Sequence, residues 1–230
     1  MAAPVPATGV AGTATFAVSV SVSITPSGSD RVMTGGSIWR NSTVVPTVTF
    51  NTSETLTAMN SGTAATGSGL NGLLWYRYAP TATTANCVFN WGGSEEAQGA
   101  VWATNWTGAH QTNPPTGFVS AAGSTVTPTV NVSSVPTDAA TFDTMGTFAG
   151  SVSSLGAGQS GILSAAQSMG GGGVLHASYD GTNTGTVTQS YTIPLDDWLI
   201  VAAYITAAAA AGGSVNVFQG KFGGLLVGKL

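Results

Sequence analysis

The chain has 230 residues, of which 43% are hydrophobic, only 6% are charged and 32 are glycine. An average soluble domain carries about 25% charged residues, but the apolar content is sufficient for a hydrophobic core, which excludes disorder of the highly charged type. The net charge of −4, from five basic and nine acidic residues, excludes the basic surface that nucleic-acid binding needs.

Apolar and polar residues alternate along most of the chain, which is the pattern of half-buried strands. In residues 16–24 every even position is apolar, and the strand is expected to end in the turn Thr25–Asp30, which contains proline and glycine. Further strands are predicted at residues 31–39, 43–51, 73–78, 86–91, 97–106, 125–132, 140–148, 173–178, 185–193 and 198–205. Roughly ten short strands separated by turn residues predict an all-β fold, an antiparallel β-sandwich of jelly-roll type.

The boundaries of the pattern divide the chain into three regions. We expect an N-terminal extension at 1–12, one sandwich domain at 13–205, and an Ala/Gly tether with an apolar C-terminal arm at 206–230. The arm residues are Val215, Val217, Phe218, Phe222, Leu225, Leu226, Val227 and Leu230. Eight such side chains, at about 1.5–3 kcal/mol each for full burial, favour docking on a neighbouring subunit or on the surface of a larger assembly. The alternative is that the arm returns to its own sandwich as an edge strand.

Two segments interrupt the strand pattern. Residues 154–173 are Gly-rich and are predicted to form a loop that holds one helical turn within 162–169. Gly156–Gly161 matches G-x-G-x-x-G, but a dinucleotide site needs a strand that leads into a helix, so a Gly-rich loop is favoured. The uncharged run 198–220 is long enough to span a membrane, but its Gly, Asn and Gln residues favour a strand followed by an arm. The N-terminus lacks the pattern of a secretory signal.

Residues for acid–base or metal chemistry are scarce. The chain has two histidines, His110 and His176, and one cysteine, Cys87, which excludes a Cys-based zinc site. The acid pairs Glu95–Glu96 and Asp196–Asp197 are adjacent, and adjacent residues in a strand point to opposite faces. The sequence therefore predicts no enzyme activity, no catalytic residues, no cofactor and no metal.

The tryptophans offer one candidate ligand surface. All six lie in or beside predicted strands, where most are expected to fill the core. Trp102 and Trp106 share one face of a strand, and His110 follows in a polar segment, so these three residues form a possible carbohydrate-binding surface. The alternative is that both indoles are buried.

A series of short motifs follows the strands in order. They are Ser29–Arg31, Ser37–Ser42, Val48–Asn51, Leu74–Pro80, Ala85–Trp91, Glu96–Val101, His110–Pro114, Thr129–Ser134, Gly156–Gln159 and Asp197–Trp198. The series resembles a β-sandwich family of tailed bacteriophages and bacterial genomes, whose members are virion-associated or uncharacterised. The resemblance covers residues 14–205 and contains no catalytic motif. It differs at Val32–Gly36, where two glycines replace the usual apolar strand.

The resemblance implies a structural protein of a bacteriophage virion, namely a capsid decoration or cement protein that stabilises the head. The expected partners are further copies of the chain, as a trimer or dimer, and the major capsid protein, with no nucleic acid and no membrane. The expected location is the virion, after synthesis in the bacterial host cytoplasm. Two alternatives stay open: a tail or fibre component, and a carbohydrate-binding or receptor-binding adhesin that uses Trp102 and Trp106.

Overall fold

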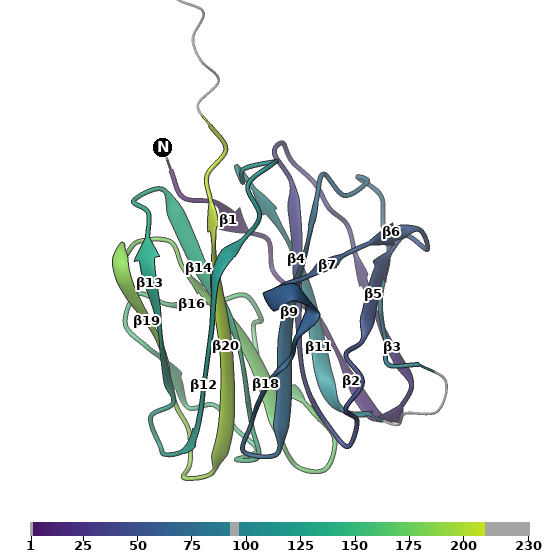
Figure 1. Cartoon of the computed structure of the whole chain (residues 1–230), viewed down its shortest axis with the longest axis vertical. Coiled ribbons are helices and arrows are strands. Elements are labelled where there is room, and N and C mark those ends of the chain that lie inside the picture. Colours follow the sequence, from purple (N-terminus) through teal and green to yellow (C-terminus); the bar gives the residue numbers. More distant parts are fainter. Residues whose placement is uncertain (1, 93–96, 210–230) are drawn as a thin grey trace, which may run out of the picture.

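The computed structural model describes residues 2–92 and 97–209. Strands dominate these residues and form four antiparallel sheets (Figure 1). The one helical element in the described part is the three-residue 3-10 turn η1 (Asn60–Gly62), and no helix there is long and apolar enough to cross a membrane. The predicted all-β antiparallel fold is confirmed.

The N-terminal half of the chain forms one pair of sheets. Its large sheet contains β1 (Val5–Pro6), β2 (Val10–Ala17), β4 (Val32–Arg40), β7 (Thr57–Ala58), β8 (Ala65–Gly67), β9 (Leu70–Tyr78) and β11 (Ala97–Thr107). Its small sheet contains β3 (Ser19–Ile24), β5 (Thr47–Phe50), β6 (Glu54–Thr55) and β10 (Ala85–Asn90). The main strands lie side by side in the orders β2-β11-β4-β9 and β3-β10-β5-β6.

The C-terminal half forms a second pair of sheets. Its large sheet contains β12 (Thr116–Ser124), β14 (Ala139–Thr147), β16 (Ser160–Gly161), β17 (Gln167–Ser168), β18 (Val174–Asp180) and β20 (Asp197–Thr206). Its small sheet contains β13 (Thr129–Val135), β15 (Ser154–Leu155) and β19 (Gly185–Thr192). The orders are β12-β20-β14-β18 and β13-β19-β15.

The two halves share one connection pattern. In each, the chain alternates between the large and the small sheet, and the first large-sheet strand pairs with the last. This is the jelly-roll pattern, so the chain contains two jelly rolls in tandem. The strand pattern predicts one sandwich over 13–205, whereas the structure has two in this range. Alternating burial specifies strands and faces, but it does not specify which strands share a sheet, and the halves have no visible sequence repeat.

The sheets also extend beyond the predicted ends of the sandwich. β1 and β2 pair with β11, so residues 5–6 and 10–12 of the predicted N-terminal extension lie in the first large sheet. At the other end, the Ala208 N–H donates to the Gly108 carbonyl at 2.8 Å. Residues 5–12 and 206–208 therefore belong to the folded body.

Three apolar clusters fill the spaces between four layers of sheet. One lies inside each jelly roll, and the third lies between the two large sheets. Figure 1 shows these layers side by side, from β13 and β19 at the left to β3 and β5 at the right. Because both faces of each large sheet are covered, all nine residues of β14 and the first ten of β11 are buried. The two jelly rolls therefore share a continuous core.

Most predicted strands are present, but the predicted ranges do not cover β12 (Thr116–Ser124), and two further segments differ. Residues 16–24 are not one strand: the chain leaves the first large sheet after Ala17 and enters the small sheet at Ser19, so Phe16 is 56% exposed. The segment 154–173 contains short strands and bends but no helical turn. Its apolar residues Ile162 and Leu163 pack into the central cluster instead.

Gly36 allows the two large sheets to approach each other. A Cβ atom at this position in β4 would lie 2.5 Å from Trp102 Nε1 and closer still to Thr144 Oγ1 of the opposite sheet. We expect Gly36→Ala to lower the free energy of unfolding by about 1–3 kcal/mol, because the surrounding core cannot move away. Gly181→Ala is the matched control, since its Cβ would be 3.6 Å from its nearest neighbour. Equal unfolding midpoints in urea for both variants would contradict this close packing.

Candidate functional sites

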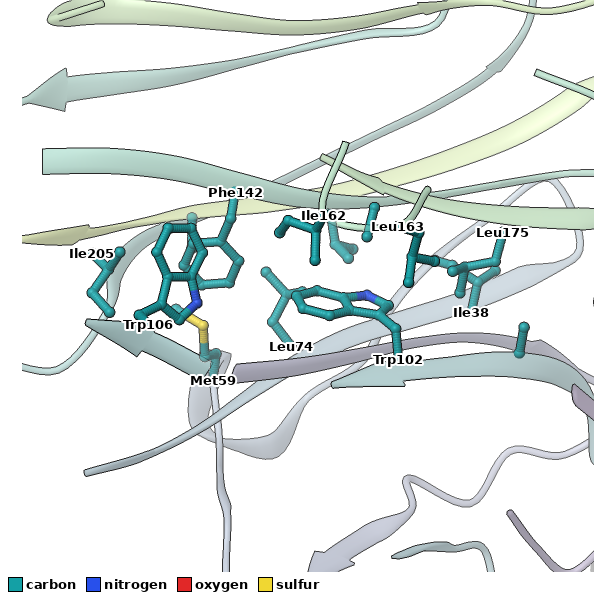
Figure 2. Packing of buried hydrophobic residues seen from close by; sticks show 14 of the residues in the cluster. Ile38, Met59, Leu74, Trp102, Trp106, Phe142, Ile162, Leu163, Leu175 and Ile205 are labelled. Carbon is teal, nitrogen blue, oxygen red and sulfur yellow. The ribbon is translucent and has the colours of Figure 1, made fainter. Parts of the chain in front are cut away.

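Trp102 and Trp106 do not form a ligand surface. Both are fully buried in the cluster between the jelly rolls (Figure 2). The Trp102 Nε1–H donates to Thr144 Oγ1 at 2.6 Å, and the Trp106 Nε1–H donates to Thr34 Oγ1 at 2.8 Å. The prediction that they share a face is correct, but the prediction of an exposed surface is wrong. The second large sheet covers that face.

His110 lies in the segment that links the two jelly rolls. It does not form a surface with Trp102 and Trp106, because both tryptophans are buried. Its Nδ1 atom accepts hydrogen bonds from the backbone N–H groups of Thr112 at 3.2 Å and Asn113 at 3.1 Å. The backbone N–H of His110 donates to the Thr206 carbonyl at 2.9 Å. These contacts shape the linker and attach it to the end of β20.

The eight predicted arm residues lie outside the described part of the chain, which ends at Ala209. The last backbone contacts before this point involve Ala207 and Ala208. The Ala207 N–H donates to the Asp138 carbonyl at 2.9 Å, and Ala208 bonds to Gly108. The arm therefore begins beside the linker between the jelly rolls.

A pocket of about 350 Å³ opens at the same junction. Its lining comes from the β7–η1 segment and β9 of the first jelly roll, the linker, and the start of β12; the residues are Thr57, Ala58, Met59, Asn60, Ser61, Tyr76, Pro114, Pro115, Thr116, Gly117 and Phe118. The Tyr76 ring packs edge-on against Tyr78, with centroids 5.4 Å apart. None of the lining residues is charged, and the lining combines hydroxyl and amide side chains with the apolar groups of Met59, the two prolines and Phe118.

A second candidate site is a polar cluster buried inside the second jelly roll. Asp143 of β14 is completely buried, and its carboxylate accepts the Ser178 N–H and the Ser178 hydroxyl, each at 3.1 Å. The Tyr191 hydroxyl and, at 3.4 Å, the Gln159 amide also donate to it. The four residues come from β14, the β15–β16 loop, β18 and β19. The cluster is not visible in the sequence because its members are far apart along the chain.

Burial controls protonation in this cluster. It raises the pKa of Asp143 to about 7, although hydrogen bonds from Tyr191 and Ser178 act in the opposite direction. Burial and the neighbouring Asp143 charge raise the pKa of Tyr191 well above its usual value. Burial lowers the pKa of His176, whose Nδ1 has no hydrogen-bond partner among the described residues. A serine nucleophile needs a base within hydrogen-bond reach. The Ser178 hydroxyl bonds to Asp143 rather than to His176, so Ser178 and His176 do not form a nucleophile–base pair.

The remaining sequence motifs have structural roles in the described residues. The motif Gly156–Gly161 forms the loop after β15 and ends in β16, and no helix follows it. Asp180 accepts the N–H groups of Thr182 at 2.8 Å and Asn183 at 3.2 Å, as expected for a turn. No group of three or more His, Cys, Asp or Glu side chains is placed to hold a metal ion in residues 2–92 and 97–209.

Comparisons with known proteins give no family. No family model and no curated protein matches the chain. Among solved structures, the major capsid protein P2 from bacteriophage PM2 aligns with a TM-score of 0.26 and 8% identity, over 90% of this chain and 100% of that chain. The STIV MCP aligns with a TM-score of 0.25 and 9% identity, over 90% and 97% of the two chains. TM-scores this low do not establish a common fold, and the resemblance to the tailed-phage family stays a prediction.

Proposed function

We propose that the chain is a structural protein of a virus particle and acts as many packed copies in or on the protein shell. The observation that carries this proposal is the fusion of two jelly rolls through a buried apolar interface into one four-layer block. Jelly rolls are a recurring architecture of viral capsid proteins. A fold alone does not define a function, but the small side chains and few charges also suit a rigid packing unit.

The more specific proposal is a capsid decoration or cement protein that stabilises the head of a bacteriophage, with the major capsid protein as its partner. The motif series supports this role.

A second candidate, the shell-forming subunit itself, is favoured by the tandem arrangement. Three such chains around a threefold axis would present six similar blocks, which suits hexagonal packing. A tail or fibre component stays an alternative, whereas the adhesin loses its basis because Trp102 and Trp106 are buried.

Sheet edges support self-association. β12 lies at an edge of the second large sheet, and β3 and β13 lie at edges of the small sheets. Exposed edges are usually protected by charged residues, above all lysine, but both lysines of this chain lie in the last ten residues. Association with identical copies, as a trimer or dimer, would cover these edges.

Deletion of the gene in a producing virus distinguishes the two shell roles. A decoration or cement protein is dispensable for shell assembly, so particles should form but lose their contents at a lower temperature. For a shell-forming subunit, no particles should form. Mass spectrometry of purified wild-type particles provides the decisive control, because absence of the chain from them would contradict both roles.

Deletion of residues 212–230 should separate assembly from folding. The backbone pairing of β20 is complete by Ala208, so the unfolding midpoint should change by no more than about 2 °C. Self-association and particle binding should weaken, because the eight apolar arm residues are lost. Analytical ultracentrifugation and thermal unfolding measure the two effects. If the truncated protein unfolds, the arm is part of the core.

A further inference from the structure

The junction pocket lies between two strands that each end a sheet. β7 is the last strand of the first large sheet and pairs only with β9, while β12 pairs only with β20. The free side of an edge strand presents backbone groups that can pair with another extended segment. The pocket therefore combines an uncharged lining with two sheet edges.

The wall formed by β12 is irregular at this point. The pairing with β20 shifts between Thr116 and Val119, and Gly117 has a φ of +69°. Such a bulge leaves residues without their ladder partners and redirects neighbouring side chains. Phe118, which lies in this bulge, is only partly buried and lines the pocket. The junction thus offers both an aromatic side chain and backbone groups that are not part of the regular β12–β20 pairing.

The C-terminal segment has the composition of a peptide that can add to a sheet edge. Residues 214–230 contain eight apolar side chains and four glycines but only two charged side chains, Lys221 and Lys229. Valine and phenylalanine favour extended strands, and extended peptides add to sheet edges while alternate side chains fill pockets. An uncharged pocket of about 350 Å³ is large enough for one or two such side chains.

The path of the chain favours a neighbouring copy over the same copy. Thr116 in the pocket wall is the pairing partner of Tyr204, and β20 then continues away from the pocket to Ala209. The five residues from 205 to 209 cover about 17 Å when extended. To bind the pocket of its own molecule, the following segment therefore has to turn back along β20. The 21 residues from 210 to 230 can span up to about 70 Å, which is enough to reach an adjacent molecule.

We propose that the junction pocket binds the apolar C-terminal segment, residues 214–230, of a second copy of this chain. The segment would add its backbone at the edge of β7 or β12 and insert an aromatic side chain near Tyr76 and Phe118. This inference rests on the proposal that the chain acts as packed copies, and it names the contact that would join them.

Disulfide trapping in the full-length protein tests this contact. Thr57→Cys places a thiol at the pocket, where Thr57 is exposed, and Phe222→Cys places one in the segment. The native Cys87 is fully buried, and burial raises its pKa to about 12, so it should not react. The two single variants are mixed, oxidised mildly and separated on a non-reducing gel. We expect a disulfide-linked dimer in at least about tenfold higher yield than with the control.

The control pairs Phe222→Cys with Thr129→Cys, an exposed position on β13 in the second small sheet. Pro114→Cys, also exposed in the pocket, replaces Thr57→Cys if that variant does not fold. Dimer yields equal to the control, while ultracentrifugation still shows oligomers, would overturn the pocket inference and leave the proposed function standing. A disulfide within one molecule of the double variant, with none in the mixture, would overturn the assignment to a second copy. Absence of both oligomers and particle association would count against the proposed function itself.

Discussion

Trp102→Ala is expected to lower the free energy of unfolding by about 4 kcal/mol. The indole is fully buried between the two large sheets, where Figure 2 shows it among side chains from both jelly rolls. Its removal leaves a cavity, and Thr144 Oγ1 loses the donor that now lies 2.6 Å away. Gly36, which lies against the indole ring, has no side chain that could move into the space.

Thermal unfolding followed by circular dichroism measures this effect. A loss of this size lowers the midpoint by roughly 8–16 °C in a domain of about 200 residues. Leu195→Ala is the control, because Leu195 is 72% exposed and its truncation should change the free energy by less than about 0.5 kcal/mol. If Trp102→Ala and Leu195→Ala unfold at the same temperature, the contact between the jelly rolls does not contribute to stability.

The strands could be predicted from the sequence because their signal is local. Alternation of buried and exposed residues in Ser19–Ile24 is visible without any knowledge of partners, and the structure has this pattern. The packing of one jelly roll on the other depends on which strands share a sheet. Burial on both faces removes the alternation from β11 and β14, so their sequences do not show which face meets which layer. The exposed surface predicted for Trp102 and Trp106 was wrong for that reason.

The candidate sites were harder to predict than the fold. Asp143 lies in the buried strand Ala139–Thr147, and its donors Gln159, Ser178 and Tyr191 are 16 to 48 residues away. The pairing of β14 with β18 places Asp143 opposite Ser178, whereas Tyr191 comes from β19 of the small sheet and Gln159 from the β15–β16 loop. The junction pocket likewise joins residues 57–61 to residues 114–118. A charged residue inside a predicted strand was the one available signal for the Asp143 cluster.

Asp143→Asn should remove a pH dependence of stability that the wild-type protein shows between about pH 4 and pH 7. The fold raises the pKa of this carboxyl from 3.8 to about 7, because the charged form is buried without a cation. The folded state therefore favours the protonated acid. Its stabilising contribution is complete below pH 4 and is lost as the pH rises through 7. A shift of about three units corresponds to roughly 4 kcal/mol, so asparagine, which does not ionise, should make the protein more stable at pH 8.

Urea unfolding of both proteins at pH 4, 5, 6, 7 and 8 measures this difference. Other groups also titrate, and their effects cancel when the variant is compared with the wild type. His176, with its lowered pKa, destabilises the fold as the pH falls, and so do Glu54 and Asp180, whose hydrogen bonds lower their pKa values despite burial. Ser178→Ala is a control variant, since it removes a donor to Asp143 without removing the ionisable group.

We expect the gain in the free energy of unfolding from Asp143→Asn to grow steadily from pH 4 to pH 7 and then level off. A gain that is constant across this range would show that the carboxyl does not change its charge there, and that the four hydrogen bonds hold it ionised throughout.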